Sequence, residues 1–151
     1  MIKVPVFVIL FVWFLCSCGS VGSDINTEVA SVGKEFAESY FNFDLSRAKQ
    51  LSTVESEKWL KFYASNVTDV DIKSLIEDGN GASCVGVDVE MLTDTTATVS
   101  CEMSGFLDNE SLDAAPHIAS DGLFVFNLVK RKGRWLVKME GLPQNERQNR
   151  D

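Results

Sequence analysis

The spacing of apolar residues changes once along this chain, at the turn-forming segment Asp78-Gly79-Asn80-Gly81. Before this segment, apolar residues recur at intervals of three and four, which is the period of an amphipathic helix. After it, apolar and polar residues alternate, which is the period of a half-buried strand. A helical half followed by an antiparallel half predicts an α+β fold, with a long N-terminal helix and short helices packed on a sheet of about four strands. The clearest helical stripe consists of Ile25, Val29, Val32, Phe36 and Tyr40.

Residues able to cap helices divide the first half. Two pairs have the three-residue spacing of a capping box, in which a hydroxyl and a carboxylate satisfy each other's backbone donors. The candidate caps are Ser23 or Asp24, Asp44, Ser52 with Glu55, and Thr68 with Asp71. The expected helices run to about Asn42, over 45–51 and over 55–64, and a last one carries Ile72, Leu75 and Ile76.

Two hairpins are expected in the second half. The first joins strands around 85–91 and 97–103 through Asp94-Thr95, and the second joins 124–130 to 135–140 through Arg131-Lys132-Gly133. Trp135 begins the last strand and is expected to anchor it in the core. The segment between the hairpins, 105–121, is expected to be a loop, and the polar tail 143–151 is expected to fray.

The first 17 residues have the pattern of a signal peptide. Lys3 precedes an apolar run, Val4 to Leu15, that is too short to cross a bilayer, which takes about 20 residues. The alternative interpretation is an N-terminal helix or strand buried on all sides, because the run contains no polar residue.

The run ends in Leu15-Cys16-Ser17-Cys18, which resembles a bacterial lipobox. The resemblance implies acylation of the Cys18 thiol with a palmitate-type lipid and cleavage after Ser17, so that Cys16 is lost with the leader. The chain then divides into signal peptide 1–17, lipidated tether 18–23, domain 24–141 and tail 142–151. An ordinary secretory signal that releases a soluble protein is the alternative.

An aspartate directly after the lipidated cysteine would resemble an inner-membrane retention signal, and an acidic cluster would resemble a surface-export signal. The residues after Cys18 contain neither. The expected location is therefore the outer membrane of the bacterial envelope, facing the periplasm. The formal net charge of −8 disfavours nucleic-acid binding, because phosphate would be repelled. Anionic headgroups would be repelled too, so membrane attachment requires a covalent or inserted anchor, which is expected to be the lipid on Cys18.

Cys84 and Cys101 remain as candidates for a disulfide in an oxidising compartment. Strand alternation opposes the pairing, because with a two-residue turn Cys101 would lie opposite Asp88 and Cys84 opposite Gly105. A bridge therefore requires a bulge or a shifted register, for which Gly86 is a suitable position. Both outcomes stay open on the sequence alone.

Several segments together resemble nuclear-transport-factor-2-like domains. Residues Phe36-Ala37-Glu38-Ser39-Tyr40-Phe41-Asn42-Phe43-Asp44 and Ala48-Lys49-Gln50-Leu51 resemble the family's opening. Thr96-Ala97-Thr98-Val99 resembles an internal strand, and Leu128-Val129-Lys130-Arg131-Lys132-Gly133-Arg134-Trp135-Leu136-Val137 resembles the closing hairpin. The similarity covers about 25–140, and small lipoproteins of this kind are frequent in Bacteroidetes. It implies a cystatin-like fold in which a curved sheet wraps a long helix around a cone-shaped cavity.

This fold hosts isomerases, dehydratases, binding modules and dimerisation domains, so the fold does not choose the function. Family enzymes place an Asp or a His–Asp pair in the cone; the only histidine here, His117, has no partner identifiable from sequence. Candidate pocket residues are Tyr40, Trp59, Tyr63 and His117, although aromatic residues on apolar stripes are usually core.

The sequence shows no spacing of a metal site, phosphate loop or nucleophile, so no catalytic residue, metal or cofactor is expected. The predicted function is a non-catalytic envelope module that binds an unknown small molecule or protein, with a homodimer as a further expectation. The alternative is a small-molecule enzyme of the isomerase or dehydratase type. A plugged cone favours the first function, and an open cone with convergent polar groups favours the second.

Overall fold

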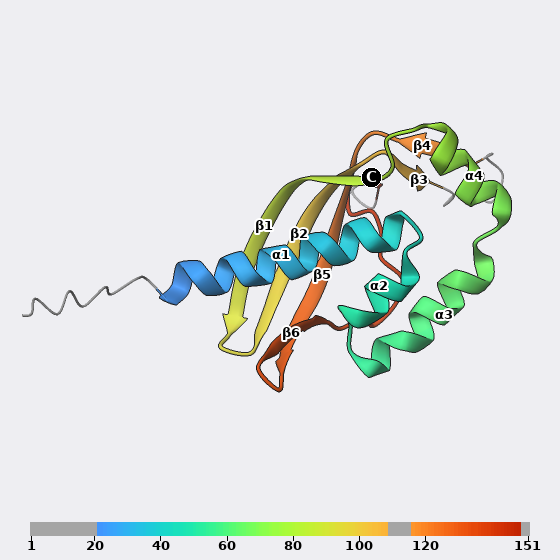
Figure 1. Cartoon of the computed structure of the whole chain (residues 1–151). Coiled ribbons are helices and arrows are strands. Elements are labelled where there is room, and N and C mark those ends of the chain that lie inside the picture. The colour runs from blue at the N-terminus through green and yellow to red at the C-terminus, as the bar shows by residue number, and fades with distance from the viewer. Residues whose placement is uncertain (1–20, 109–115, 149–151) are drawn as a thin grey trace, which may run out of the picture.

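The computed structural model describes residues 21–108 and 116–148 (Figure 1). Six antiparallel strands form two sheets, one of four strands in the order β1-β2-β5-β6 and one of two strands, β3-β4. The helices are α1 (Val21–Phe41), α2 (Leu45–Gln50), the 3-10 helix η1 (Val54–Ser56), α3 (Glu57–Asn66) and α4 (Asp69–Glu77). The strands are β1 (Ser83–Thr93), β2 (Thr96–Ser104), β3 (Phe106–Asp108), β4 (His117–Ala119), β5 (Gly122–Arg131) and β6 (Arg134–Val137).

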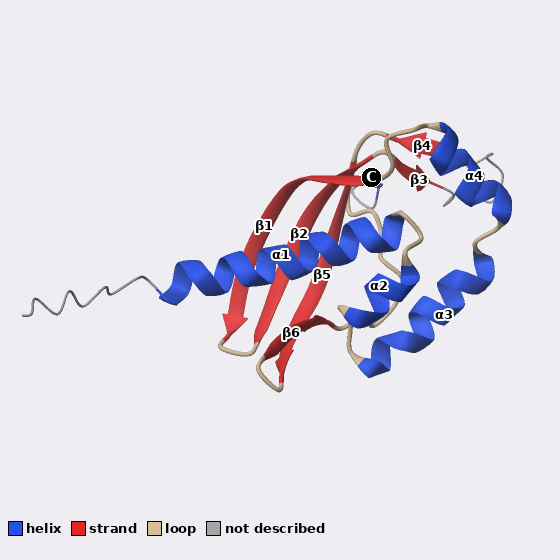
Figure 2. Cartoon of the chain, viewed as in Figure 1, coloured by secondary structure: helices blue, strands red, loops and turns tan. Residues whose placement is uncertain are grey.

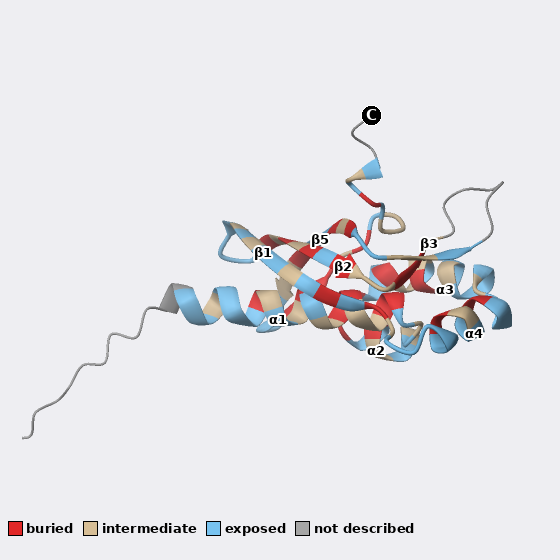
Figure 3. Ribbon diagram, turned by 90° about the horizontal axis from the view of Figure 1, so that it is seen from above, coloured by how far each residue is buried: buried red, intermediate tan, exposed pale blue. Residues whose placement is uncertain are grey.

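The predicted α+β architecture is confirmed. Figure 2 shows α1 crossing one face of the curved four-stranded sheet, with α2 and α3 near the C-terminal end of α1. Seen from above, the buried residues collect between α1 and the sheet (Figure 3). Helix α4 packs against the small β3-β4 sheet. This is the long helix on a curved sheet that the resemblance to nuclear-transport-factor-2-like domains implies.

The α1 stripe faces the sheet as its spacing predicts. Val29, Phe36 and Tyr40 are buried, and the ring of Phe36 meets that of Phe126 edge-on at 5.4 Å between centroids. Gly33 lies in the same stripe, and a Cβ there would lie 2.5 Å from Cγ1 of Val99. The absence of a side chain at Gly33 therefore lets α1 approach β2 closely. The described part of α1 already includes residues 21–23, which were expected to belong to the lipidated tether.

Two of the four expected helix caps are confirmed and two are wrong. Ser23 and Asp24 lie inside α1 and do not cap it. Asp44 accepts the backbone N–H of Arg47, and Thr68 forms a capping box with Asp71. Ser52 does not cap a helix with Glu55, because it lies in an extended segment that forms a parallel bridge with Val137 of β6. The 3-10 helix η1 then precedes α3. Its last residue, Ser56, is also held by the chain that follows β6, because Ser56 Oγ accepts the backbone N–H of Met139 at 2.9 Å. A contact with β6 here overrides the local capping signal.

Both predicted hairpins are present, but the register of the first differs from that expected. Pairing is irregular at Val85 and at Leu92, where β1 has one more residue than β2. The bulge at Val85 turns this side chain outward, with 68% exposed, and turns Cys84 into the core. The expectation that Val85 faces the core and Cys84 faces away is therefore wrong, because a bulge reverses the alternation beyond it.

The segment expected to be a loop contains the β3-β4 ladder, in which Leu107 pairs with Ile118. Three-residue strands carry too little alternation to be recognised from sequence.

The expectation of a frayed tail is wrong as far as residue 148. The Asn145 side chain is buried there, and Glu146 donates its backbone N–H to the Leu123 carbonyl at 2.8 Å.

Within the described residues, no helix is both long and apolar enough to cross a membrane. Cys18 and the predicted signal peptide lie outside the described residues.

Candidate binding site

A cavity of about 450 Å³ opens where the end of α1 meets α3, β3 and the C-terminal segment. Five of the ten described lining residues are aromatic, and the exposed wall is about equally polar and apolar. Small-molecule sites likewise combine aromatic side chains with polar groups that orient the ligand. The lining residues are Tyr40, Phe41, Tyr63, Phe106, Leu107, Asp108, Phe124, Leu142, Pro143 and Gln144.

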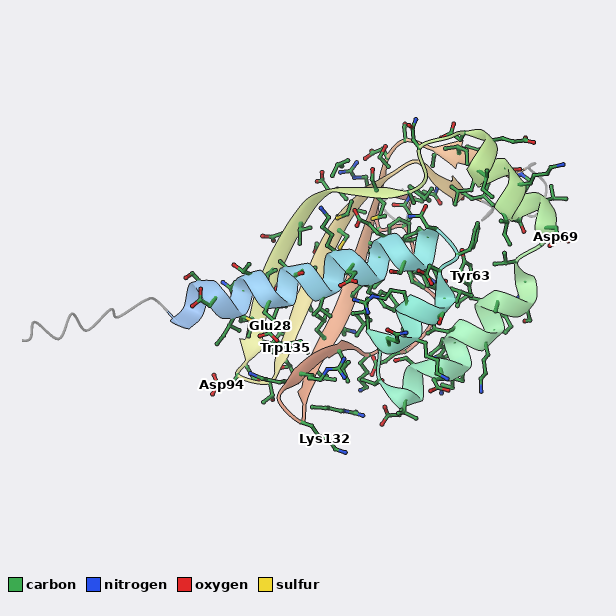
Figure 4. The ribbon with its side chains drawn as sticks, viewed as in Figure 1. Glu28, Tyr63, Asp69, Asp94, Lys132 and Trp135 are labelled. Atoms are coloured by element: carbon green, nitrogen blue, oxygen red, sulfur yellow. The ribbon has the colours of Figure 1, made fainter. Side chains whose placement is uncertain are left out.

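Two stacked tyrosines form one side of the cavity. The rings of Tyr40 on α1 and Tyr63 on α3 lie 4.2 Å apart with an angle of 14° between their planes. Figure 4 shows Tyr63 between α3 and the end of α1. Neither hydroxyl hydrogen-bonds to any residue in the described part of the chain. Two hydroxyl groups in an aromatic wall are thus available to a ligand.

Burial raises the pKa of Tyr40, and the neighbouring Tyr63 raises it further. Burial also raises the pKa of Tyr63, with an added contribution from the Asp71 carboxylate. Both phenols are therefore protonated over the physiological pH range, and each offers a hydrogen-bond donor as well as acceptor lone pairs.

Three phenylalanines form the floor of the cavity. Phe41 of α1 lies 4.4 Å from Phe124 of β5 and 5.4 Å from Phe106 of β3, between ring centroids. Phe106 and Phe124 meet edge-on at 5.3 Å. A Cβ at Gly122 would lie 2.6 Å from the Phe106 ring, so this cluster requires glycine at the start of β5. Because the rings support one another, the floor is a fixed surface.

Among the described lining residues, Asp108 at the end of β3 is the one that carries a carboxylate. Its side chain is only 11% exposed, and Gln148 Nε2 donates to its Oδ2 at 3.0 Å. His117 lies opposite Asp108 in the β3-β4 ladder, with its Nε2 3.9 Å from the same oxygen. That distance is too long for a hydrogen bond but short enough for an electrostatic interaction when the imidazole is protonated. This partner of His117 could not be identified from sequence, because residues 109–115 separate the two strands.

The C-terminal segment closes one side of the cavity with Leu142, Pro143 and Gln144. The adjoining Asn145 fixes its position, because its Oδ1 accepts the backbone N–H groups of Leu123 and Arg147, both at 3.1 Å. Arg147 also forms ion pairs with Asp121 and Glu102. A segment that composition alone marks as a polar tail is therefore part of the site.

Of the four predicted pocket residues, the structure places Tyr40 and Tyr63 in the cavity wall. Trp59 is not a lining residue; it packs against the core, its indole N–H is buried without a hydrogen-bond partner among the described residues, and Lys58 lies 5.1 Å from its ring centroid. His117 is not a lining residue either, and its side chain is 65% exposed. No group of three or more potential metal ligands occurs in the described ranges.

Cys84 and Cys101 are free, buried thiols on neighbouring strands. Cys84 pairs with Met103 and Cys101 with Val87, so the bulges bring the two cysteines to a diagonal position on one face. Burial raises the pKa of both thiols; the other thiol lowers the pKa of Cys84 and raises that of Cys101 further. The disulfide stays a prediction.

No protein-family model matches the sequence, and no curated protein is significantly similar to it. Among solved structures, the chain is similar to an NTF-2-like protein of unknown function from Shewanella oneidensis MR-1. The two share 17% identity, the match covers 74% of this chain and 92% of the other, and the TM-score is 0.47.

Proposed function

We propose that this chain is a lipid-anchored protein of the bacterial envelope that binds a small molecule in the aromatic cavity. The observation that supports the binding role is the open cavity of about 450 Å³ with five aromatic lining residues. A cavity that served only the core would be filled by side chains, because protein interiors are close-packed. An unfilled aromatic site of this size matches the volume of small-molecule pockets.

The lining defines the class of ligand. The Phe41, Phe106 and Phe124 rings offer an apolar surface, so the body of the ligand is apolar or aromatic. The Tyr40 and Tyr63 hydroxyls offer hydrogen bonds, and the Asp108 carboxylate offers an acceptor. The ligand is thus an amphipathic molecule whose polar group is neutral or cationic, since an anionic group would be repelled by Asp108.

The ligand can be tested with N-phenyl-1-naphthylamine, a neutral aromatic amine that fluoresces in apolar surroundings. We expect the detergent-solubilised protein to enhance its fluorescence and Gln144→Trp, which places a ring at the cavity mouth, to weaken binding about ten-fold, or roughly 1.4 kcal/mol. Phe62→Ser is the control, because Phe62 is 54% exposed and does not line the cavity. Equal loss in both variants would place the probe elsewhere on the surface.

The anchor is supported by the Leu15-Cys16-Ser17-Cys18 sequence and is tested separately. In a bacterium that lipidates proteins, the wild-type chain is expected to incorporate a palmitate analogue and to fractionate with membranes. Cys18→Ala is expected to lose the label, whereas Cys16→Ala retains it because Cys16 is removed with the leader. Equal labelling of the wild type and Cys18→Ala contradicts acylation at this residue.

A second candidate function, a small-molecule isomerase or dehydratase, is favoured by two observations. The cavity is open and is lined by the polar groups of Tyr40, Tyr63 and Asp108, which is the arrangement expected above for an enzyme. Asp108 borders the cavity and has a histidine, His117, 3.9 Å away, which is the type of pair that proton transfer uses. Against it, His117 lies outside the cavity wall and is largely exposed. We therefore expect His117→Ala to leave probe binding and stability nearly unchanged. An activity that His117→Ala and Asp108→Asn both abolish would replace the binding function with the enzymatic one.

A further inference from the structure

A cluster of basic residues occupies the turn between β5 and β6, in a chain whose net charge is −8. Four of the 14 lysines and arginines lie within five positions: Lys130, Arg131, Lys132 and Arg134. We call these four residues the basic turn. Arg131 donates to both carboxylate oxygens of Glu55 at 2.8 Å, and Lys130 lies 5.8 Å from the Trp135 ring centroid. Lys132 and Arg134 are exposed and form no ion pair within the described residues.

The basic turn lies at the end of the molecule where α1 begins. Ile25 and Asn26 of α1 share a surface hollow with residues Met91–Asp94 of the β1-β2 turn. Lys130 donates its backbone N–H to the carbonyl of Thr95 in that same turn at 2.7 Å. Figure 1 shows both turns at the α1 N-terminal end, with β3, β4 and α4 at the opposite end. Figure 4 shows Lys132 pointing away from the domain.

The short segment between Cys18 and α1 keeps this end of the domain close to a membrane that holds Cys18. Three residue steps separate Cys18 from Val21, where α1 begins, and they span at most about 11 Å when fully extended. If Cys18 carries the lipid, as proposed above, the first turn of α1 lies within that distance of the headgroups. The Debye length at physiological ionic strength is about 8 Å, so charges at this end act on the membrane surface when the domain brings them within about that distance of it.

We propose that the basic turn rests on anionic lipid headgroups of the membrane that holds Cys18, and that this contact turns the cavity toward the aqueous side. This inference rests on the proposed lipidation of Cys18. The net charge of the chain favours the same orientation, because an anionic surface attracts the basic turn and repels the acidic remainder. The lipid retains the protein at the membrane, and the basic turn orients it.

Carboxylates at the same end limit the strength of the contact. Asp24 and Glu28 on α1 and Asp94 on the β1-β2 turn are exposed, and Glu55 neutralises Arg131. Lys130, Lys132 and Arg134 remain, and the three carboxylates balance them, so the contact requires the basic turn itself to face the headgroups. The contact is therefore weak and sensitive to salt, and it is effective because the tether makes it intramolecular.

The orientation can be measured on the full-length lipidated protein in vesicles of phosphatidylcholine with or without phosphatidylglycerol. A fluorophore on Thr95→Cys reports on the basic end, and one on Ile76→Cys, at a position 70% exposed on α4, reports on the opposite end. Cys84 and Cys101 are buried, so the introduced thiol is the one that reacts. Lipids with a headgroup spin label quench a fluorophore that lies near the surface.

We expect quenching at Thr95→Cys to exceed that at Ile76→Cys by roughly two-fold or more in anionic vesicles and to fall in high salt. Lys132→Glu with Arg134→Glu is expected to remove the difference. Lys61→Glu with Lys73→Glu, on α3 and α4, makes the same change in net charge and is expected to leave the difference intact.

Equal quenching at the two positions, or a difference that survives charge reversal at Lys132 and Arg134, overturns the inference. Flotation of the vesicles separates this failure from that of the anchor. A protein that floats with the vesicles without end-specific quenching refutes the orientation and leaves the lipid anchor standing. A protein that does not float refutes both.

Discussion

At the scale of single residues, Gly33 shows how one missing side chain sets the distance between α1 and the sheet. Alanine favours a helix over glycine by about 1 kcal/mol, whereas overpacking a core costs about 1–3 kcal/mol. A Cβ at Gly33 would lie 2.5 Å from Val99 Cγ1, and Val99 is fully buried, so the steric cost prevails. Gly33→Ala is expected to lower the free energy of unfolding by up to about 2 kcal/mol in urea titration. Ser31→Ala, at an exposed position of α1, is the control and should be neutral or stabilising.

Glu55 and Arg131 provide a test of the contact between the start of η1 and the β5-β6 hairpin. The hydrogen bonds from the Arg131 guanidinium lower the pKa of Glu55 from 4.5 to about 2. Because the folded-state pKa is lowered, the stabilisation is present above pH 4.5 and is lost as the pH falls through about 2. In an NMR titration, Arg131→Gln is expected to return the Glu55 midpoint toward 4.5. An unchanged midpoint would mean that the ion pair does not form in solution.

At the scale of elements, the four-residue strand β6 depends on one large side chain. Trp135 is 3% exposed, which confirms its predicted place in the core. Trp135→Ala is expected to cost about 3–5 kcal/mol, as for other large aromatic truncations. The neighbouring Leu136 alternates to the other face and is partly exposed, so Leu136→Ala should cost much less. Melting temperatures compare the two variants, and similar losses would show that β6 is held by its backbone hydrogen bonds instead.

The β1 bulges change the expectation for Cys84 and Cys101. In the register expected from a two-residue turn, the two cysteines lie four positions apart along the strands. In the observed register they lie two positions apart, an offset of about 7 Å along the strand direction. With the spacing of about 4.8 Å between neighbouring strands, the two Cα atoms lie about 8 Å apart, slightly beyond the separation that a disulfide spans, so a bridge requires a small movement of β1. The two thiols already interact with each other. Since both thiols lie on the core face, we expect a bridge in protein purified from an oxidising compartment. Thiol counting after unfolding is expected to find neither cysteine free, and two free thiols would contradict the bridge.

The elements that the sequence predicts correctly are those whose pattern repeats several times. The α1 stripe and the β2 and β5 alternations each extend over many residues, so local spacing and burial agree. The bulges at Val85 and Leu92 are not visible in sequence, because a single extra residue looks like continued alternation. The Ser52 cap fails for a related reason, since its segment is held by β6, about 80 residues further along the chain.

At the scale of the whole molecule, the cavity combines residues from segments that are distant in sequence. Tyr40 and Tyr63 are predictable because they stand out on helices, whereas Phe106 and Leu142 enter only through the fold. Asp108 and His117 meet through a ladder that no pattern indicates. The candidate site is therefore a tertiary arrangement that sequence spacing does not encode locally.

The C-terminal segment couples the wall of the cavity to the sheet, and Asn145 is the residue that fixes it. Asn145 is 4% exposed, and its side chain accepts the Leu123 and Arg147 backbone N–H groups. Asn145→Ala leaves these donors unpaired, which costs about 1–3 kcal/mol and frees Leu142, Pro143 and Gln144 to move. We expect weaker binding of N-phenyl-1-naphthylamine and faster hydrogen exchange at the Leu123 and Glu146 amides.

Glu146→Ala is the matched control for this coupling, because Glu146 bonds to Leu123 through its backbone, which the substitution retains. It is expected to leave both probe binding and amide protection close to wild type. If Asn145→Ala exposes the amides without changing probe binding, the C-terminal segment is a structural cover and the ligand is held by the α1, α3 and β3 walls alone. If both quantities change together, the last residues of the fold are part of the binding site, and truncation at residue 141 removes a functional element.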